Sequence, residues 1–85
     1  MSIQWETYPP SLTWMGKENE ETVVCIQVNP PESKFAFNGV AEVWGEERDG
    51  KVTSVQLYAD GNDVVKLKQV LLEWREKFKA MMAAA

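Results

Sequence analysis

The side chains best suited to chemistry in this 85-residue chain are carboxylates, because the sequence has no histidine and only one cysteine. Without an imidazole there is no base for a serine or cysteine triad, no histidine ligand for zinc and no histidine pH switch. Cys25 stands between Val24 and Ile26 with no base near it in sequence, so we expect a small buried hydrophobic residue rather than a nucleophile. A lone cysteine also excludes an intrachain disulfide.

Six carboxylates are concentrated in two short segments that resemble turns: Glu18, Glu20, Glu21, Glu46, Glu47 and Asp49. Since the first and third turns of an antiparallel meander lie at the same end of the sheet, we expect one acidic rim. The rim suits either a solvated edge that discourages strand pairing or a surface that attracts a basic partner. Paired carboxylates also serve glycosidases and metal sites. On loop tips of so short a chain we expect no catalytic residue, no metal and no cofactor.

The apolar pattern predicts the elements that position these residues, within one domain covering residues 1–85. An N-terminal arm (1–10) ends in Pro9-Pro10, so if it forms a strand it belongs at a sheet edge. The sheet region (11–60) contains β-branched and aromatic runs that are separated by turn residues. A helix (61–83) follows, with Asx residues suited to cap it. The predicted fold is α+β: an antiparallel meander of three to four strands with one C-terminal helix packed on one face.

The helix shows an apolar stripe at steps of three and four residues: Val64, Leu67, Leu71, Trp74, Phe78 and Met81. We expect this stripe to pack on the sheet and to bury Leu71, Trp74 and Phe78. Val65 and Leu72 fall together on the back of the helix, and a basic strip of Lys68, Arg75 and Lys79 runs beside them. The strip can dock a protein or touch phosphates, but three cations on a chain of net charge −4 make nucleic acid an unlikely partner.

Alternation along the strands assigns a richly apolar set to the face beneath the helix, including Val24, Ile26, Phe37, Ala41, Val43 and Leu57. The opposite face is not cleanly polar, because it carries Val23, Cys25, Val40, Trp44, Val52 and Tyr58. A sheet face with this much apolar surface is normally covered. Its cover is either the N-terminal arm, through Trp5, Tyr8 or Trp14, or another chain. A bulge at Gly39 would exchange the two faces.

These observations favour a small non-catalytic protein-interaction module: an accessory, adaptor or inhibitor protein such as phages and mobile elements encode. The expected partner is another protein, a second copy forming a homodimer included, bound through the open sheet face and/or the acidic rim. The expected binding residues are Val40, Trp44, Tyr58, Val65, Leu72 and the six rim carboxylates. The alternative is a nucleic-acid-associated protein that uses the basic strip. With no signal peptide and no apolar run long enough to span a bilayer, we expect a cytoplasmic protein without a membrane partner.

Overall fold

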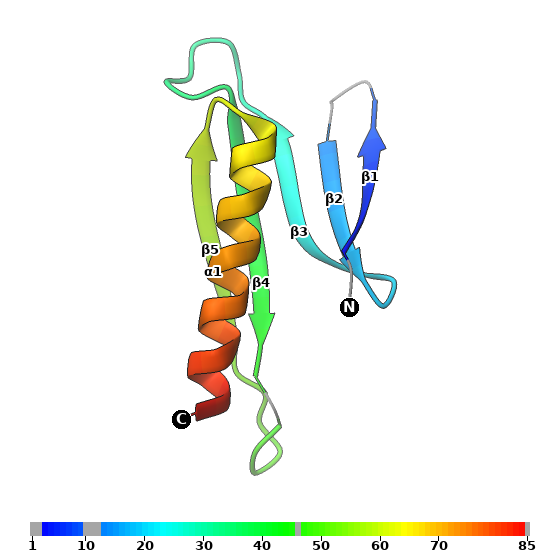
Figure 1. Ribbon diagram of the computed structural model, residues 1–85, viewed down its shortest axis with the longest axis vertical. Coiled ribbons are helices and arrows are strands. Elements are labelled where there is room, and N and C mark those ends of the chain that lie inside the picture. Colours follow the sequence, from blue (N-terminus) through cyan, green and yellow to red (C-terminus); the bar gives the residue numbers. More distant parts are fainter. Residues whose placement is uncertain (1–2, 10–12, 46, 85) are drawn as a thin grey trace.

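The computed structural model describes residues 3–9, 13–45 and 47–84, which form an antiparallel sheet and one C-terminal helix (Figure 1). The strands are β1 (Gln4–Tyr8), β2 (Thr13–Glu18), β3 (Glu21–Val28), β4 (Phe37–Trp44) and β5 (Ser54–Gly61), and α1 covers Val64–Ala84. The sheet order β1-β2-β3-β4-β5 follows the chain. The α+β class is therefore confirmed, whereas the expected count of three to four strands was too low. The arm supplies the additional strand, and β1 lies at an edge of the sheet as expected.

Two tight turns set the register of the sheet. Asn19 and Glu20 join β2 to β3 with φ of 52° and 67°, and Asp49 and Gly50 have φ of 54° and 75° between β4 and β5. Positive φ at both central residues is the backbone geometry that matches the right-handed twist of a hairpin. The helix begins at a side-chain cap, where Asp63 Oδ1 accepts a 2.9 Å hydrogen bond from the Val65 amide.

The helix covers one face of β4, β5 and part of β3 (Figure 1). Beneath it lie the buried residues of the face predicted from alternation: Val24, Ile26, Ala41, Val43 and Leu57. Gly39 pairs in continuous register with Ile26 and Ala59, so no bulge exchanges the faces there. The irregularity lies instead between Gly16 and Lys17 of β2. Alternation therefore identified the helix-facing side of the sheet correctly.

The contact face of the helix is rotated relative to the predicted stripe. Leu71 is fully buried and Phe78 is partly buried, as expected, but Trp74 is 40% exposed, and its expected burial was wrong. Leu72, expected on the outer side, is partly buried against the core, and Arg75 is only 7% exposed. The reason is that the sheet ends just past the helix at β5 but continues through three strands on the other side. Side chains on that flank therefore find more neighbours.

Two large side chains of the arm, Ile3 and Trp5, lie on the helix side of the sheet, whereas Tyr8 lies on the opposite side with its hydrogen-bond partner Glu6. Trp5 is opposite Gly16, which is opposite the core residue Val24, and paired residues share a face. A Cβ at Gly16 would lie 3.0 Å from Ile3 Cγ2 and 3.1 Å from the Trp5 ring, so a larger residue there would have to displace these side chains by a few tenths of an ångström. Lys68 of α1 places its Nζ 4.5 Å from the centre of the Trp5 ring. The arm therefore extends the sheet and does not cover its second face.

Candidate protein-binding surface

The face of the sheet that points away from α1, which we call the open face, carries exposed aromatic side chains on β4 and β5. Val40 is opposite Tyr58, one residue out of phase with the buried pair Ala41 and Leu57. Tyr58 is 69% exposed and Trp44 is 55% exposed. Among the described residues, no element packs over this face. Aromatic side chains left accessible beside apolar neighbours are the residue type that dominates protein interfaces.

Two successive side-chain hydrogen bonds link Tyr58 of β5, through Gln56 of the same strand, to Glu42 of β4. Gln56 Nε2 donates to Glu42 Oε1 across the strands at 3.2 Å, and the Tyr58 hydroxyl donates to Gln56 Oε1 at 2.5 Å. Trp44 lies beyond these hydrogen bonds, beside a shallow groove that is also lined by Val23 and Glu42. The open face is thus built on regular, paired strands rather than on a loop, so its aromatic side chains are held in position before a partner arrives.

Cys25 lies on the same face, directly opposite Val40, and is half-buried rather than enclosed in the core. Partial burial removes water from the sulfur and raises the pKa of the thiol above its ordinary value. The thiol therefore stays protonated and weakly nucleophilic at neutral pH. The geometry gives it a packing role within the open face.

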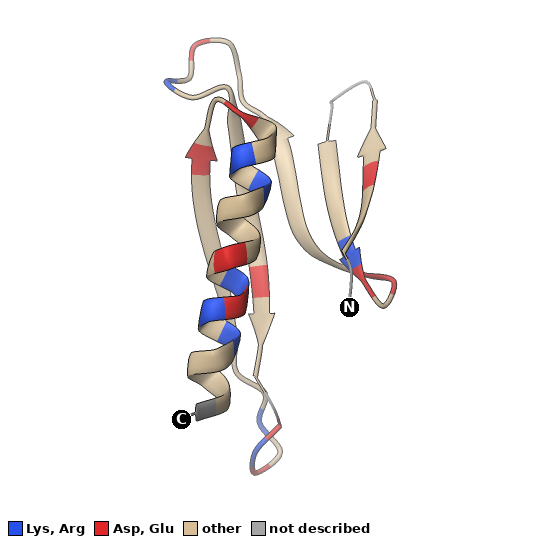
Figure 2. Ribbon diagram, viewed as in Figure 1, with Lys and Arg blue, Asp and Glu red and all other residues tan. Residues whose placement is uncertain are grey.

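The expected acidic rim is divided into separate groups (Figure 2). Glu20 and Glu21 are exposed at the β2–β3 turn, whereas Glu47 and Asp49 are exposed in the β4–β5 loop. That loop also contains the cations Arg48 and Lys51, whose backbones pair in an isolated β-bridge. The loop is therefore mixed in charge. Glu46 lies outside the described residues. The two turns therefore do not form one continuous negative surface.

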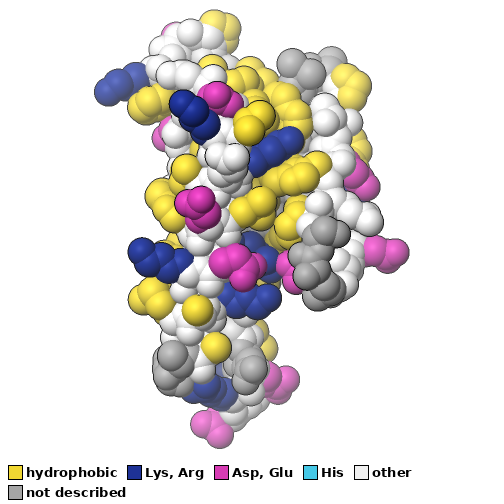
Figure 3. Space-filling model, viewed as in Figure 1, with side chains coloured by type: hydrophobic (Ala, Val, Ile, Leu, Met, Phe, Trp, Pro, Cys, Tyr) yellow, Lys and Arg dark blue, Asp and Glu magenta, His cyan; other side chains and the backbone are white. Residues whose placement is uncertain are grey.

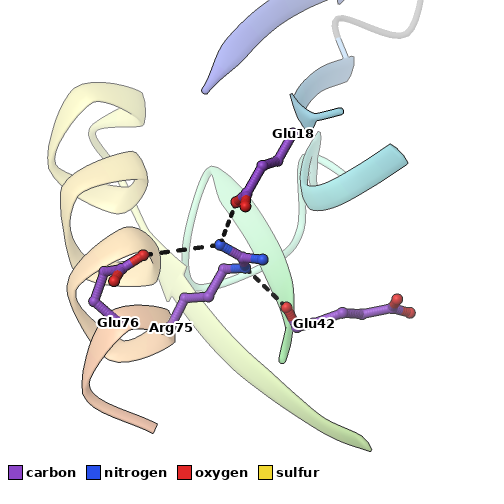
Figure 4. A network of polar contacts seen from close by, with 4 residues as sticks. All are labelled: Glu18, Glu42, Arg75 and Glu76. Carbon is purple, nitrogen blue, oxygen red and sulfur yellow. Dashed lines mark hydrogen bonds and ion pairs between the residues drawn. The ribbon is translucent and has the colours of Figure 1, made fainter. Parts of the chain in front are cut away.

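Glu18, the sixth expected rim residue, faces the helix and forms an ion pair there (Figure 4). Arg75 donates from Nη1 to Glu18 Oε2 at 2.8 Å and from Nε to the Glu42 carbonyl at 3.0 Å. The two side chains are only 8% and 15% exposed, respectively. Glu76 approaches the same Nη1 at 3.9 Å. Because the guanidinium joins α1, β4 and the end of β2, this contact fixes how the β1–β2 hairpin sits beside the helix.

The basic strip expected on the back of the helix is not assembled as such. Arg75 is turned inward to Glu18, and Lys68 lies over the Trp5 ring. Lys79 is exposed. Of the two apolar residues expected beside the strip, Val65 is 63% exposed and Leu72 is partly buried. The structure therefore does not bring these five residues together as one surface.

A second accessible apolar group was missed by sequence reasoning, because it was assigned to the core. Trp74 is 40% exposed and Met81 is 58% exposed, and both lie on the flank of α1 beside β5. Val70 and Lys77 complete a row on this flank at steps of four, three and four residues. The spacing was visible in the sequence, but it overlaps the stripe that faces the sheet.

No family model, curated protein or solved structure matches the chain. Over the described residues, no helix has both the length and the apolar character needed to cross a membrane.

Proposed function

We propose that this protein is a small, non-catalytic protein-interaction module that binds its partner through the open face of the sheet. The single observation that carries the proposal is the exposure of Trp44 and Tyr58, at 55% and 69%, on a face that no described element covers. Aromatic residues at the centre of an interface each contribute about 2 kcal/mol or more to binding. Val40 and Cys25 extend the apolar part of the surface across β3 and β4.

The expected partner surface is apolar at its centre and basic on one side. Glu42 lies within the open face, and Glu47 and Asp49 lie in the adjoining β4–β5 loop. Acidic groups around an aromatic centre accelerate association with a basic partner and disfavour an acidic one. The basic strip offers a nucleic acid less support, because two of its three cations contact other side chains of the chain.

Quantitative affinity capture from the native host tests this proposal. The immobilised baits are the wild-type protein, Trp44→Glu and Gln69→Glu, the last adding the same charge at an exposed position of α1. We expect wild type and Gln69→Glu to capture the same protein and Trp44→Glu to lose at least about ninety per cent of it, since 2 kcal/mol is a factor of about 30. Circular dichroism establishes that all three baits are folded. Equal capture by folded Trp44→Glu would refute the open face as the binding site.

A further inference from the structure

The outer edge of β5 presents unpaired backbone groups. The Gly45 amide donates to the Thr53 carbonyl at 2.8 Å, so Thr53 belongs to a hydrogen-bonded pair with β4. Hydrogen-bonded and non-hydrogen-bonded pairs alternate along an antiparallel ladder. In the continuous register of β4 and β5, the backbone N–H and C=O groups of Val55, Leu57 and Ala59 therefore point to β4. Those of Ser54, Gln56, Tyr58 and Asp60 point away from the sheet.

This edge lacks the features that keep edge strands from pairing. β5 is eight residues long, pairs with β4 without a register shift, and contains one charged residue, Asp60, and no proline. The opposite edge, β1, is five residues long and is followed by Pro9. On β1, Glu6 forms a 3.0 Å ion pair with Lys17 of β2 and also accepts a hydrogen bond from the Tyr8 hydroxyl. Short, charged edges resist strand addition, whereas long, regular and uncharged edges invite it.

An apolar flank of the helix accompanies the free edge along its length. Val70, Trp74, Lys77 and Met81 form a row at steps of four, three and four residues, which places them on one side of α1. Grooves between this row and β5 meet at Trp74, one continuing toward Gly61 and the other toward Gln56. In Figure 3, hydrophobic side chains are visible along this side of the helix.

We propose that a second copy of this chain docks on the β5 edge, joining the two sheets into one antiparallel sheet of ten strands. With Gln56 opposite the partner's Tyr58, all four outward-facing residues of β5 form hydrogen-bonded pairs. Asp60 then lies opposite the partner's Ser54, so no like charges meet. The two-fold axis passes through Leu57, at the middle of the strand. Trp74 lines the same groove as Leu57 and lies at the middle of the helix, so the same axis brings it to the partner's Trp74.

The spacing of the layers fits a second copy better than an isolated peptide strand. The helix covers both β4 and β5, so its axis lies about one strand spacing from the two-fold axis. The two helices are then about 10 Å apart, which is the usual distance for packed helices. An added peptide strand would satisfy the backbone groups but would leave Trp74 and Met81 uncovered. Only a partner that brings its own helix also fills the flank.

Charge and area agree with this arrangement. Glu73 precedes Trp74 by one residue and Lys77 follows it by three. Each Lys77 therefore comes within about 3 Å, along the helix axis, of the partner's Glu73.

The edge is about 26 Å long, and the shortest extent of the molecule is 20 Å. The projected area of the side that carries this edge is therefore roughly 500 Å². Because the surface is uneven, its accessible area is larger and approaches the value of about 800 Å² that each partner buries in a specific interface.

Sedimentation equilibrium from about 1 μM to about 500 μM protein tests the dimer by mass action. We expect wild type to shift from monomer to dimer with rising concentration. Gln56→Pro removes one outward N–H from each copy without touching the ladder to β4, and we expect the dissociation constant to rise at least about tenfold. Gln56→Ala removes the same side chain but keeps the N–H, so its dissociation constant should stay within about threefold of wild type. Circular dichroism reports whether the variants fold.

A charge exchange provides a second test that does not depend on proline being tolerated. Lys77→Glu places two carboxylates together at each crossing, and we expect it to weaken the dimer about tenfold. Adding Glu73→Lys reverses both charges, so the double variant should return to within about threefold of wild type. A wild-type protein that remains monomeric throughout would overturn the proposal. So would a dimer that is unaffected by Gln56→Pro and Lys77→Glu, or one that only Trp44→Glu dissociates, because that contact would lie on the open face.

Discussion

Leu71 of the helix packs closely over Gly39 of β4. Leu71 is fully buried, and a Cβ built on Gly39 would lie 2.6 Å from Leu71 Cδ1 and 3.2 Å from Ile26 Cγ1. Leu71→Ala should lower the free energy of unfolding by about 3–4 kcal/mol, the usual loss for a buried leucine whose site cannot collapse. That is a large part of the roughly 4–13 kcal/mol expected for a chain of this length.

Gly39→Ala should have opposite effects in the two backgrounds. In wild type the new methyl group displaces Leu71, and overpacking of this kind costs about 1–3 kcal/mol. Replacing glycine within a strand returns about 0.5–1 kcal/mol through backbone entropy. In Leu71→Ala the contact with Leu71 is gone, and only the milder 3.2 Å approach to Ile26 Cγ1 opposes the favourable part. The free energies of the two substitutions should therefore fail to add by about 2 kcal/mol, with the double variant more stable than the sum predicts.

Urea unfolding, followed by far-ultraviolet circular dichroism, measures all four corners of this cycle. At about 1–1.5 kcal/mol per molar urea, Leu71→Ala should lower the unfolding midpoint by about 2–4 M. Gly39→Ala should lower the midpoint of wild type but raise that of Leu71→Ala. If Gly39→Ala costs the same free energy in both backgrounds, Leu71 does not rest on Gly39, and the placement of the helix on the sheet is wrong.

The remaining predictions concern Arg75, Cys25 and Asp63. Arg75→Met should lower the free energy of unfolding in urea by about 3 kcal/mol, because it leaves the Glu18 carboxylate partly buried without its partner. Adding Glu18→Gln should recover part of that loss, and a double variant no more stable than Arg75→Met would contradict this role. Burial raises the pKa of Cys25. Since the thiolate is the reactive form, alkylation by iodoacetamide should be slower than for a free thiol at pH 7 and should rise as the pH passes the raised pKa. A folded Cys25→Ala protein should still capture the partner, and its loss of capture would give the thiol a direct role. Asp63→Ala should lower the free energy of unfolding by about 1 kcal/mol, whereas Asp63→Asn should cost much less, as measured by thermal melting. Equal losses from both substitutions would show that the cap hydrogen bond is not responsible.

Alternation along the strands was sufficient to predict which side chains lie beneath the helix. Ala41, Val43 and Leu57 are buried and Trp44 and Tyr58 are exposed, as their phase requires. The two-residue period of a strand determines which face a side chain points to. It does not determine the burial, since Val23 on the opposite face is only 6% exposed and Val28 on the helix face is 43% exposed. The uninterrupted pairing at Gly39 preserved that phase.

The rotation of the helix was not predictable from its own stripe. Apolar spacing shows which residues can be buried, but the extent of the sheet on either side of α1 decides which of them are. Trp74 lost neighbours because β5 is an edge, whereas Leu72 gained them beside the additional strands. The inward turn of Glu18 had a visible signal, because it is in phase with Trp14 and Gly16. Assigning Glu18 to a turn concealed this phase, since β2 continues to Glu18.

The attachment of the β1–β2 hairpin determines how the protein begins to open. The hairpin is joined to the remainder by the ladder to β3, by packing of Ile3, Trp5 and Trp14, and by Arg75 and Lys68 on the helix. If these contacts break together, the hairpin detaches while the helix remains on β4 and β5. The event exposes the edge of β3, an eight-residue strand rich in β-branched side chains. Such an edge can add strands from other molecules, so detachment of this one hairpin gives the protein a further site for aggregation besides the edge of β5.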